Sequence, residues 1–282
     1  MALGRLTVDP RHWQIAALAG LTAYGVFGLG FDTTPARAGL VVASALATQW
    51  AFSRLARVRF DPRSALISAL SLCLLLRASA LWLLPATAFV TVASKFVIRF
   101  RCKHVFNPTN FGLVAMALAT GQVWTSPGQW GSAVFFAFLM ACLGILVVHR
   151  AVRSDVTFAF LACYVAGIGA RALWLGDPLA IPLHQLQSGA LLLFSFFMIS
   201  DPRTTPDARA ARILFGALVA AGALYVQLRL YRPGGPLLAL FLLSPLVPVL
   251  DRLMPGSRYV WKGDSYATPA APRERALGPA VG

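Results

Sequence analysis

The chain has 282 residues, of which 58% are hydrophobic and 12% are charged, and its mean hydropathy is +0.69. Soluble domains carry about 25% charged residues, so this composition excludes an ordinary soluble protein and indicates a protein embedded in a lipid bilayer. The formal charge of +15 does not indicate nucleic-acid binding, because the basic residues are spread over many loops. We therefore expect the bilayer, and no nucleic acid, as a partner.

Apolar runs along the chain predict an all-α, polytopic membrane protein with about ten transmembrane helices, since about 17 to 25 apolar residues cross a bilayer as a helix. Arg77 interrupts the third run, and Pro85 leaves no polar loop before the fourth. A broken or re-entrant segment therefore explains that region as well as two full spans do. The expected spans are residues 14–31, 36–53, 64–84, 85–100, 108–122, 131–149, 155–175, 184–200, 209–228 and 235–251.

Most arginines and lysines fall on alternate loops, on the same side as the N-terminus. The positive-inside rule then predicts an even number of spans and a multi-pass protein of the inner (plasma) membrane with both termini in the cytoplasm. We divide the chain into a cytoplasmic segment (1–13), one transmembrane domain (14–254) and a cytoplasmic tail (255–282) that we expect to be disordered. Within the membrane domain, five-span pseudo-repeats are expected at about 14–122 and 131–251.

Two polar, proline-containing breaks interrupt the apolar pattern: KHVFNPTNFG, Lys103–Gly112, and SDPRTTPDAR, Ser200–Arg209. Both fall on the predicted cytoplasmic side, and we interpret them as holding matching places in the two halves. Such breaks are costly in a bilayer unless they line a site, and membrane proteins built from repeats often place their site between the halves. We therefore expect a site where the two breaks lie.

Within the breaks, Asn107 is expected to cap a helix that starts at Pro108, and Asn110 lies on its first turn, where it can bind a ligand. In the second break, Asp201 precedes a proline, and Thr204 or Thr205 is expected to cap a helix that starts near Pro206. Capping alone explains each of these residues. Their presence in both breaks favours a site.

Arg101, Lys103 and His104 form a basic cluster, which predicts either an anchor for anionic lipid headgroups or a clamp for a phosphate. Lys95 is expected to reach the cytoplasmic interface, and Asp155 is expected to open the seventh helix. The scattered histidines and the absence of CxxC spacing support no metal site. No catalytic motif is found, so no catalytic residue is assigned.

At these two breaks the chain resembles a family of membrane proteins from redox complexes. KHVFNPTNFG followed by GLVAMAL is similar to the NPFNPA-type segment of RnfD, from the Rnf ferredoxin–NAD oxidoreductase, and of NqrB, from the sodium-translocating NADH–quinone reductase. FFMISDPRTTPDARAARILFG, Phe196–Gly216, resembles the family's FFMATDPVTSP segment, and SALISALSLCLLL, Ser64–Leu76, is similar to its third span. This short, arginine-rich chain resembles most the UnbU-like subgroup, found with enediyne biosynthesis genes.

The resemblance implies a ten-span protein with a urea-transporter-like arrangement of repeats that carries flavin. In the redox subunits, FMN is attached to the threonine of an SGAT motif in the outside loop after the fifth span. Here that loop reads TGQVWTSPGQWG, Thr120–Gly131, without SGAT, and the chain's only SGA, Ser188–Ala190, falls elsewhere. Noncovalent FMN is therefore expected over covalent FMN, with Thr125 or Ser126 as the covalent candidate, and absence of a cofactor stays open. The expected cofactor contacts are Arg101, Lys103, His104, Asn107, Asn110, Asp201, Thr204 and Thr205.

The first functional hypothesis is a divergent membrane subunit of this electron-transport family, which moves electrons or couples redox chemistry to transport. As an enzyme it would be a non-autonomous part of a membrane oxidoreductase with redox partner subunits. The second hypothesis is a non-redox transporter or channel for a small polar or natural-product molecule. A third is a membrane scaffold that recruits redox or biosynthetic partners.

Overall fold

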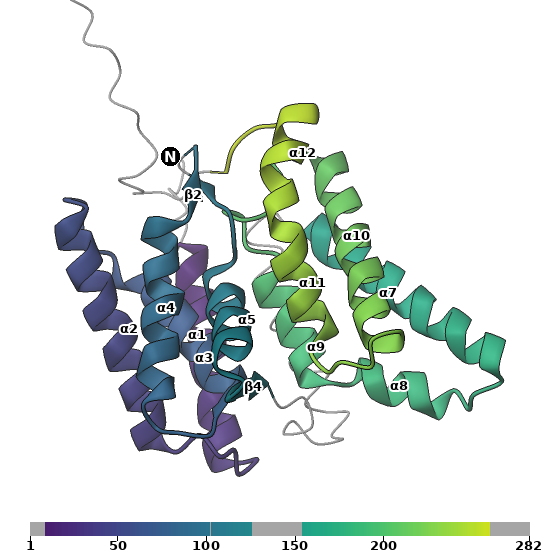
Figure 1. Cartoon of the computed structure of the whole chain (residues 1–282), viewed down its shortest axis with the longest axis horizontal. Helices are drawn as coiled ribbons and strands as arrows, with labels where there is room; N and C mark the ends of the chain where they lie inside the picture. Colours follow the sequence, from purple (N-terminus) through teal and green to yellow (C-terminus); the bar gives the residue numbers. More distant parts are fainter. Residues whose placement is uncertain (1–8, 102, 126–153, 260–282) are drawn as a thin grey trace, which may run out of the picture.

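The computed structural model describes residues 9–101, 103–125 and 154–259, and most of these residues are helical (Figure 1). The helices lie in two groups, which follow one another along the chain. The first group consists of α1 (Pro10–Phe27), α2 (Pro35–Leu55), α3 (Pro62–Leu75), α4 (Leu83–Val97) and α5 (Pro108–Thr120). The second group consists of α7 (Ser154–Leu175), α8 (Ala180–Leu186), α9 (Gly189–Leu193), α10 (Arg209–Leu228), α11 (Gly235–Leu243) and α12 (Val247–Leu253). The predicted helical character is confirmed.

Four helices of the first group begin with a capping side chain followed by proline. The pairs are Asp9-Pro10 at α1, Thr34-Pro35 at α2, Asp61-Pro62 at α3 and Asn107-Pro108 at α5. In each pair the side-chain oxygen accepts a hydrogen bond from a backbone N–H in the first turn, and proline at the first helical position has no N–H to leave unpaired. The prediction that Asn107 caps the helix starting at Pro108 is confirmed.

The third predicted span is broken. Helix α3 has 14 residues, which at about 1.5 Å per residue is shorter than the roughly 30 Å hydrocarbon core. It ends where β1 (Leu76–Ala78) begins, and β1 pairs antiparallel with β4 (Val123–Thr125), which follows α5. Arg77, in the middle of β1, is therefore opposite Trp124 in a two-stranded ladder. At the other end of α4, β2 (Arg99–Phe100) pairs with β3 (Lys103–His104) in a short hairpin.

Three helical segments of the described residues are long and apolar enough to cross a membrane: 154–175, 209–228 and 235–253. The last combines α11, the 3₁₀ turn η3 (Ser244–Leu246) and α12. A fourth candidate is a pair bent by 48°, α8 followed by 189–198, in which α9 continues as the π-helix η2 (Phe194–Met198). These segments agree with a membrane protein, whereas the count of ten spans stays a prediction. The sixth expected span, Ser126 and most of the two terminal segments lie outside the described residues.

The helix groups are held by close packing and by ion pairs. Helices α4 and α5 approach so closely that a methyl group built on Gly112 would lie 1.8 Å from the hydroxyl of Thr91. In the second group, Arg212 of α10 donates to both carboxylate oxygens of Asp155, in the first turn of α7, at 2.6 to 2.9 Å. Asp155 therefore opens the seventh helix as predicted, and it also ties α7 to α10.

A ring of four charged residues joins the starts of α1 and α3. Arg11 contacts Asp9 and Asp61 at 2.7 and 2.8 Å, and Arg63 contacts the same two carboxylates at 2.7 and 2.8 Å. Burial alone would raise the pKa of both carboxyl groups, but the hydrogen bonds and charges of the two arginines lower the pKa of each. The tripeptide Asp-Pro-Arg thus occurs twice in one ring, and it occurs a third time at Asp201.

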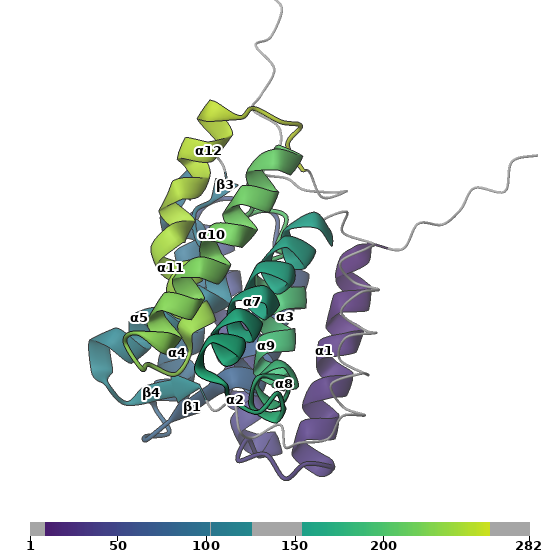
Figure 2. The ribbon, with the colours of Figure 1, turned by 90° about the vertical axis from the view of Figure 1, so that its right-hand side faces the viewer.

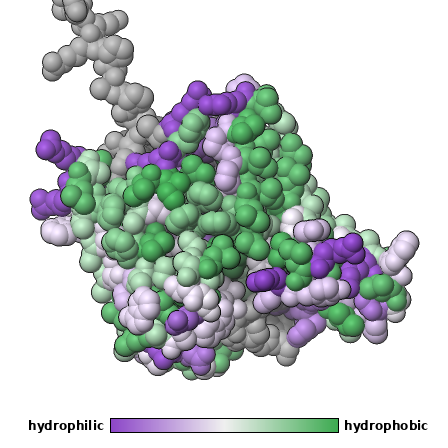
Figure 3. All heavy atoms as spheres, in the orientation of Figure 1, coloured by the Kyte–Doolittle hydropathy of each residue, from purple (hydrophilic) through white to green (hydrophobic). Residues whose placement is uncertain are grey.

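Contact between the groups runs mainly through α5 and α11 (Figures 1 and 2). Three phenyl rings pack there, with centroids 5.2 Å apart for Phe106–Phe111 and for Phe106–Phe241. Apolar side chains cover much of the face in Figure 3, which is the face that these helices contribute to. A bilayer-facing surface of this kind is expected for a membrane protein.

The two polar breaks join different elements of the described residues. The first joins α4 to α5, and the second joins η2 to α10 and is followed by a further segment, α11 to α12. The segment between α5 and α7 that contains the sixth expected span lies outside the described residues. The expectation that the breaks match one another as copies of a repeat therefore stays a prediction.

Candidate functional site

The two polar breaks meet at one end of the interface between the helix groups. Asn107, at the start of α5, donates from its side-chain nitrogen to the backbone oxygen of Met198 at 3.3 Å and to a carboxylate oxygen of Asp201 at 3.5 Å. Its side-chain oxygen accepts from the N–H of Asn110 at 3.1 Å. One asparagine therefore caps α5 and binds the second break. We call the contact between residues 103–110 and 198–207 the polar junction.

Asn110 is fully buried one turn into α5. Neither atom of its side-chain amide has a hydrogen-bond partner among the described residues. An unpaired buried amide costs about 1–3 kcal/mol, so this side chain is expected to bind a water molecule or a ligand.

Thr204 and Thr205 do not cap a helix near Pro206, so that prediction is wrong. Helix α10 begins at Arg209, and its capping residue, Ala208, has no side chain that accepts a hydrogen bond. Both threonine hydroxyls instead donate to the backbone oxygen of Asp201, at 3.3 and 3.1 Å. The threonines therefore hold the turn that follows Asp201, because that turn leaves its carbonyl oxygen accessible to their hydroxyls.

His104 and Asp201 are held in unusual electrostatic surroundings at the junction. Burial and the charge of the nearby Arg203 lower the pKa of His104 well below its usual value. The neutral ring can then accept a hydrogen bond at Nε2 from the guanidinium of Arg203, 3.2 Å away. Asp201 keeps some accessible surface, yet its burial raises the pKa of the carboxyl group despite the hydrogen bond from the Arg203 N–H.

Lys103 is neutralised by two carboxylates from the second helix group. Its ammonium nitrogen lies 3.0 Å from Asp207 and 2.7 Å from Asp251. Arg101, by contrast, is exposed at the turn of the β2–β3 hairpin. Of the basic cluster predicted from sequence, Lys103 and His104 are therefore engaged within the protein and Arg101 remains accessible.

The prediction that Lys95 reaches the cytoplasmic interface is wrong. The side chain is 4% exposed, and its ammonium group donates to the hydroxyl of Ser64 at 3.2 Å. The last turn of α4 packs inside the first group, which turns Lys95 inward toward α3. A buried lysine without a carboxylate within ion-pair distance among the described residues was not expected from sequence.

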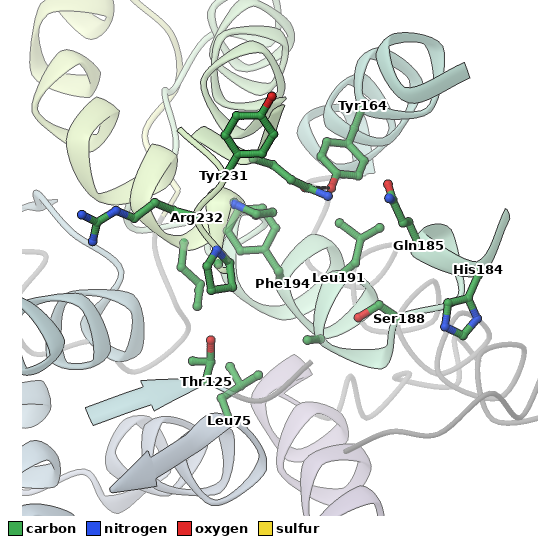
Figure 4. A pocket seen from close by; sticks show the side chains of 16 residues that line it. Leu75, Thr125, Tyr164, His184, Gln185, Ser188, Leu191, Phe194, Tyr231 and Arg232 are labelled. Carbon is green, nitrogen blue, oxygen red and sulfur yellow. Dashed lines mark hydrogen bonds between the residues drawn. The ribbon is translucent and has the colours of Figure 1, made fainter. Parts of the chain in front are cut away.

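A large cavity of about 770 Å³ lies at the opposite end of the interface between the groups (Figure 4). The first group contributes Leu75 and Thr125, and the second contributes the loop before α11 and the start of the bent pair. Thr125 reaches the second group closely, since a methyl group built on Gly234 would lie 3.8 Å from its hydroxyl. The lining residues that we use below are Thr125, Tyr164, Ser188, Phe194, Gln227 and Arg232.

The walls of the large cavity combine aromatic rings with few polar groups. Phe194 is buried, and the Tyr164 hydroxyl donates to the side-chain oxygen of Gln227 at 2.6 Å. Arg232 supplies an exposed cation at the rim. Cofactor sites are typically clefts of about 300–1,000 Å³ with apolar walls and a few polar groups, and this cavity fits that description.

The sequence prediction for the site thus divides between two places. Thr125 lines the large cavity, and so does Ser188 of the chain's only SGA sequence. The other expected contacts lie in or beside the polar junction, where Arg101, Lys103 and His104 line a hollow of only about 160 Å³. The roles of these residues as cofactor contacts stay predictions.

Sequence reasoning missed Asp207, Asp251 and the aromatic wall of the large cavity. Asp207 belongs to the second break, and the first break is basic. The opposite charges of the two breaks were a usable signal that they pair. Tyr164 and Gln227 lie inside predicted spans, where a hydroxyl and an amide needed buried partners. Nothing in the sequence indicated that the two would bind one another.

The sequence profile of the NQR2, RnfD, RnfE family matches residues 109–259, which include the second break and all of the second helix group. The chain belongs to this family. Similar proteins include the D subunit of the ion-translocating oxidoreductase complex of Citrobacter koseri, which is 33% identical over 134 residues, 47% of this chain and 37% of that protein. The corresponding protein of Shewanella amazonensis is 27% identical over 147 residues, 51% of this chain and 39% of that protein. The matches therefore span less than two-fifths of these relatives.

Proposed function

We propose that this chain is a membrane subunit of an RnfD/NqrB-type electron-transport system. It binds a flavin without a covalent bond in the large cavity. The proposal is supported by family membership and by the names of the similar subunits, which belong to ion-translocating oxidoreductase complexes. The observation that carries it is the cavity of about 770 Å³ between the two helix groups. Other subunits of such a complex are the expected partners. The same proposal places the protein in the plasma membrane with both termini in the cytoplasm.

The residues of the large cavity fit a flavin nucleotide. Phe194 and Tyr164 are almost fully buried and form part of the apolar wall, and the half-buried amide of Gln227 offers hydrogen bonds to the polar edge of a planar ring. Arg232 can pair with a phosphate through a planar fork of N–H donors. A bound flavin would supply the ability to accept and donate electrons, and the apolar walls would keep water from it.

Two features support a noncovalent over a covalent flavin. The loop that begins at Thr120 lacks the SGAT motif, and the hydroxyls of Thr125 and Ser188 come from different helix groups. Both hydroxyls lie at the same cavity, so either can hydrogen-bond a phosphate without an attaching enzyme. Arg232 then binds the negative charge of the phosphate.

The polar junction supports the function indirectly in this proposal. Asn107, Asp201 and the two threonines hold the breaks against one another, so the two walls of the large cavity keep their separation. Arg101, Lys103, His104 and Asn110 stay candidates for direct ligand contacts from the other end of the interface. A small ligand at Asn110 is compatible with a flavin in the large cavity.

An affinity comparison between FMN and riboflavin tests the proposal, because only FMN carries a phosphate. Arg232→Gln is expected to weaken FMN binding about tenfold or more, and to leave riboflavin binding unchanged. Arg229→Gln is the matched control, since Arg229 is also exposed near the end of α10 but does not line the cavity. Equal loss of both ligands, or no loss of either, would argue against the assigned role of Arg232.

A non-redox transporter for a small polar or natural-product molecule is the second candidate, and the missing SGAT motif favours it. Folded protein that binds neither FMN nor riboflavin would support this candidate. A scaffold that recruits partners, including partners in enediyne biosynthesis, would retain its effect when the cavity is filled by a Ser188→Trp substitution. Loss of function in that variant would exclude the scaffold.

A further inference from the structure

A small basic hollow lies at the same end of the molecule as the polar junction, where the β2–β3 hairpin meets the end of α12 (Figure 1). Its volume is about 160 Å³. The basic residues that line it are Arg101, Lys103, Arg252 and Arg258, and the acidic ones are Asp207 and Asp251. We call this feature the basic hollow.

The charges of the basic hollow do not cancel. Lys103 binds both carboxylates, at 3.0 and 2.7 Å, so the acidic groups are already paired. Arg101, Arg252 and Arg258 have no carboxylate within ion-pair distance among the described residues. Four basic and two acidic side chains therefore leave the hollow with a net positive charge of two, which favours an anion.

Two of these guanidinium groups are held in place by an aromatic ring. The central guanidinium carbon of Arg101 lies 5.6 Å from the centroid of Phe100, and that of Arg252 lies 5.3 Å from the same centroid. Arg258 donates to the backbone oxygen of Arg101, which has a left-handed φ of 49°. A left-handed non-glycine residue is strained, and the β2–β3 pairing and the contact with Phe100 hold Arg101 in this turn. Pre-positioned arginines suit the tetrahedral oxygens of a phosphate.

Exposed apolar side chains lie close along the chain to residues that line the basic hollow. Val97, at the end of α4, and Leu253, next to Arg252, are each 71% exposed. Hydrophilic side chains at the upper edge of the molecule border apolar side chains over α12 in Figure 3. A phosphate carried by an acyl-bearing molecule satisfies both surfaces at once, whereas a free phosphate satisfies only the arginines.

We propose that the basic hollow binds the phosphate of an anionic phospholipid at the membrane surface. Arg101, Arg252 and Arg258 contact the phosphate, and Val97 and Leu253 contact the first part of the acyl chains. This inference does not depend on the flavin proposal, because it uses a different end of the interface and a different ligand.

Lipid retention by the purified full-length chain tests the proposal. The protein in neutral detergent is exchanged with equal amounts of short-chain phosphatidylglycerol and phosphatidylcholine, and bound lipid is counted by native mass spectrometry. We expect phosphatidylglycerol to be retained about tenfold over phosphatidylcholine, since only phosphatidylglycerol carries a net negative charge that the arginines can attract. Arg101→Gln/Arg252→Gln is expected to abolish this preference.

Arg57→Gln/Arg59→Gln provides the matched control. These exposed arginines lie in the loop after α2, and Arg57 also has a left-handed φ, of 52°. The control removes the same charge and is expected to keep the preference for phosphatidylglycerol. The proposal is overturned if this control loses the preference equally, or if Arg101→Gln/Arg252→Gln keeps it. Displacement of phosphatidylglycerol by millimolar glycerol 3-phosphate or inorganic phosphate would overturn the lipid assignment in favour of a soluble phosphate.

Should the double variant fail to fold, Arg258→Gln alone carries the test. Arg258 is exposed, and among the described residues its side chain donates one hydrogen bond, to the backbone oxygen of Arg101. Its loss leaves the β2–β3 pairing and the contacts of Arg101 and Arg252 with Phe100 in place. A several-fold lower retention of phosphatidylglycerol is expected. Unchanged retention in this variant, with the double variant unfolded, would overturn the proposal.

Discussion

The two ends of the interface between the helix groups are built in opposite ways. At the polar junction, side chains of the two breaks bind one another directly, as in the 3.3 Å contact from Asn107 to Met198. At the other end, Thr125 and Arg232 line an open space of about 770 Å³. The polar junction therefore holds the two helix groups together, and the other end has the dimensions of a binding site.

This difference shows why polar residues in a membrane segment do not by themselves locate a ligand. Buried polar groups need partners, and the cheapest partner is another polar group of the same protein. The breaks satisfy most of their groups in this way, with the side chain of Asn110 as an exception. The large cavity is mostly apolar, so it gives a weaker sequence signal.

Asn107→Leu is expected to have the largest effect on stability. The substitution removes the cap of α5, which costs about 1 kcal/mol, and takes a hydrogen-bond partner from Asp201, which costs about 1–3 kcal/mol more. Lower accumulation in the membrane and a lower melting temperature in detergent are the expected readouts.

Asn107→Ser separates the two contributions, because serine can cap α5 but cannot reach Met198. An intermediate melting temperature is expected. If Asn107→Leu instead melted like the wild type but lost activity, the junction would be a ligand site and our comparison of the two ends would be wrong.

Lys103→Met is expected to have the next largest effect. It leaves the carboxylates of Asp207 and Asp251 without their shared cation in a largely buried position, at a cost of about 1–3 kcal/mol. Adding Asp251→Asn to this variant should recover part of the loss in thermal unfolding, since one unpaired charge is removed. Strictly additive losses would contradict a direct pairing.

The pH dependence of stability tests the roles of His104 and Asp201 at the polar junction. The pKa of His104 is lowered in the folded protein, so its contribution is present above the ordinary unfolded value of about 6.5 and is lost as the pH falls below it. The raised pKa of Asp201 acts in the opposite direction, because its contribution is lost as the pH rises through the folded value.

Melting temperatures between about pH 5 and 8 check this prediction. The wild type should lose stability below about pH 6.5, and His104→Gln should show a flatter profile. The same decline in both proteins would mean that other groups cause it.

Thr125→Val is expected to have the smallest effect. If the flavin is noncovalent, loss of one hydroxyl at the large cavity should weaken binding by about tenfold or less, and the stoichiometry at saturating FMN should not change. Loss of a flavin that survives denaturation in the wild type would instead identify Thr125 as a covalent attachment site.

The sequence predicted the helices of this protein better than its site. Apolar runs and the Asn-Pro, Asp-Pro and Thr-Pro starts fix where helices begin, because both signals are local. Thr204 and Thr205 show the limit, since whether a hydroxyl caps a helix or binds a preceding carbonyl depends on where the helix begins. Lys95 shows the same limit, because the inward direction of its side chain depends on how α4 packs on α3. The large cavity depends on long-range packing between groups, which no local pattern records.

The visible absorbance spectrum of the purified protein, taken before and after denaturation, tests the central claim most directly. We predict a flavin band that accompanies the folded protein and passes into the filtrate when the protein is denatured. A well-folded preparation that shows no band and takes up neither FMN nor riboflavin would contradict the assignment of the large cavity.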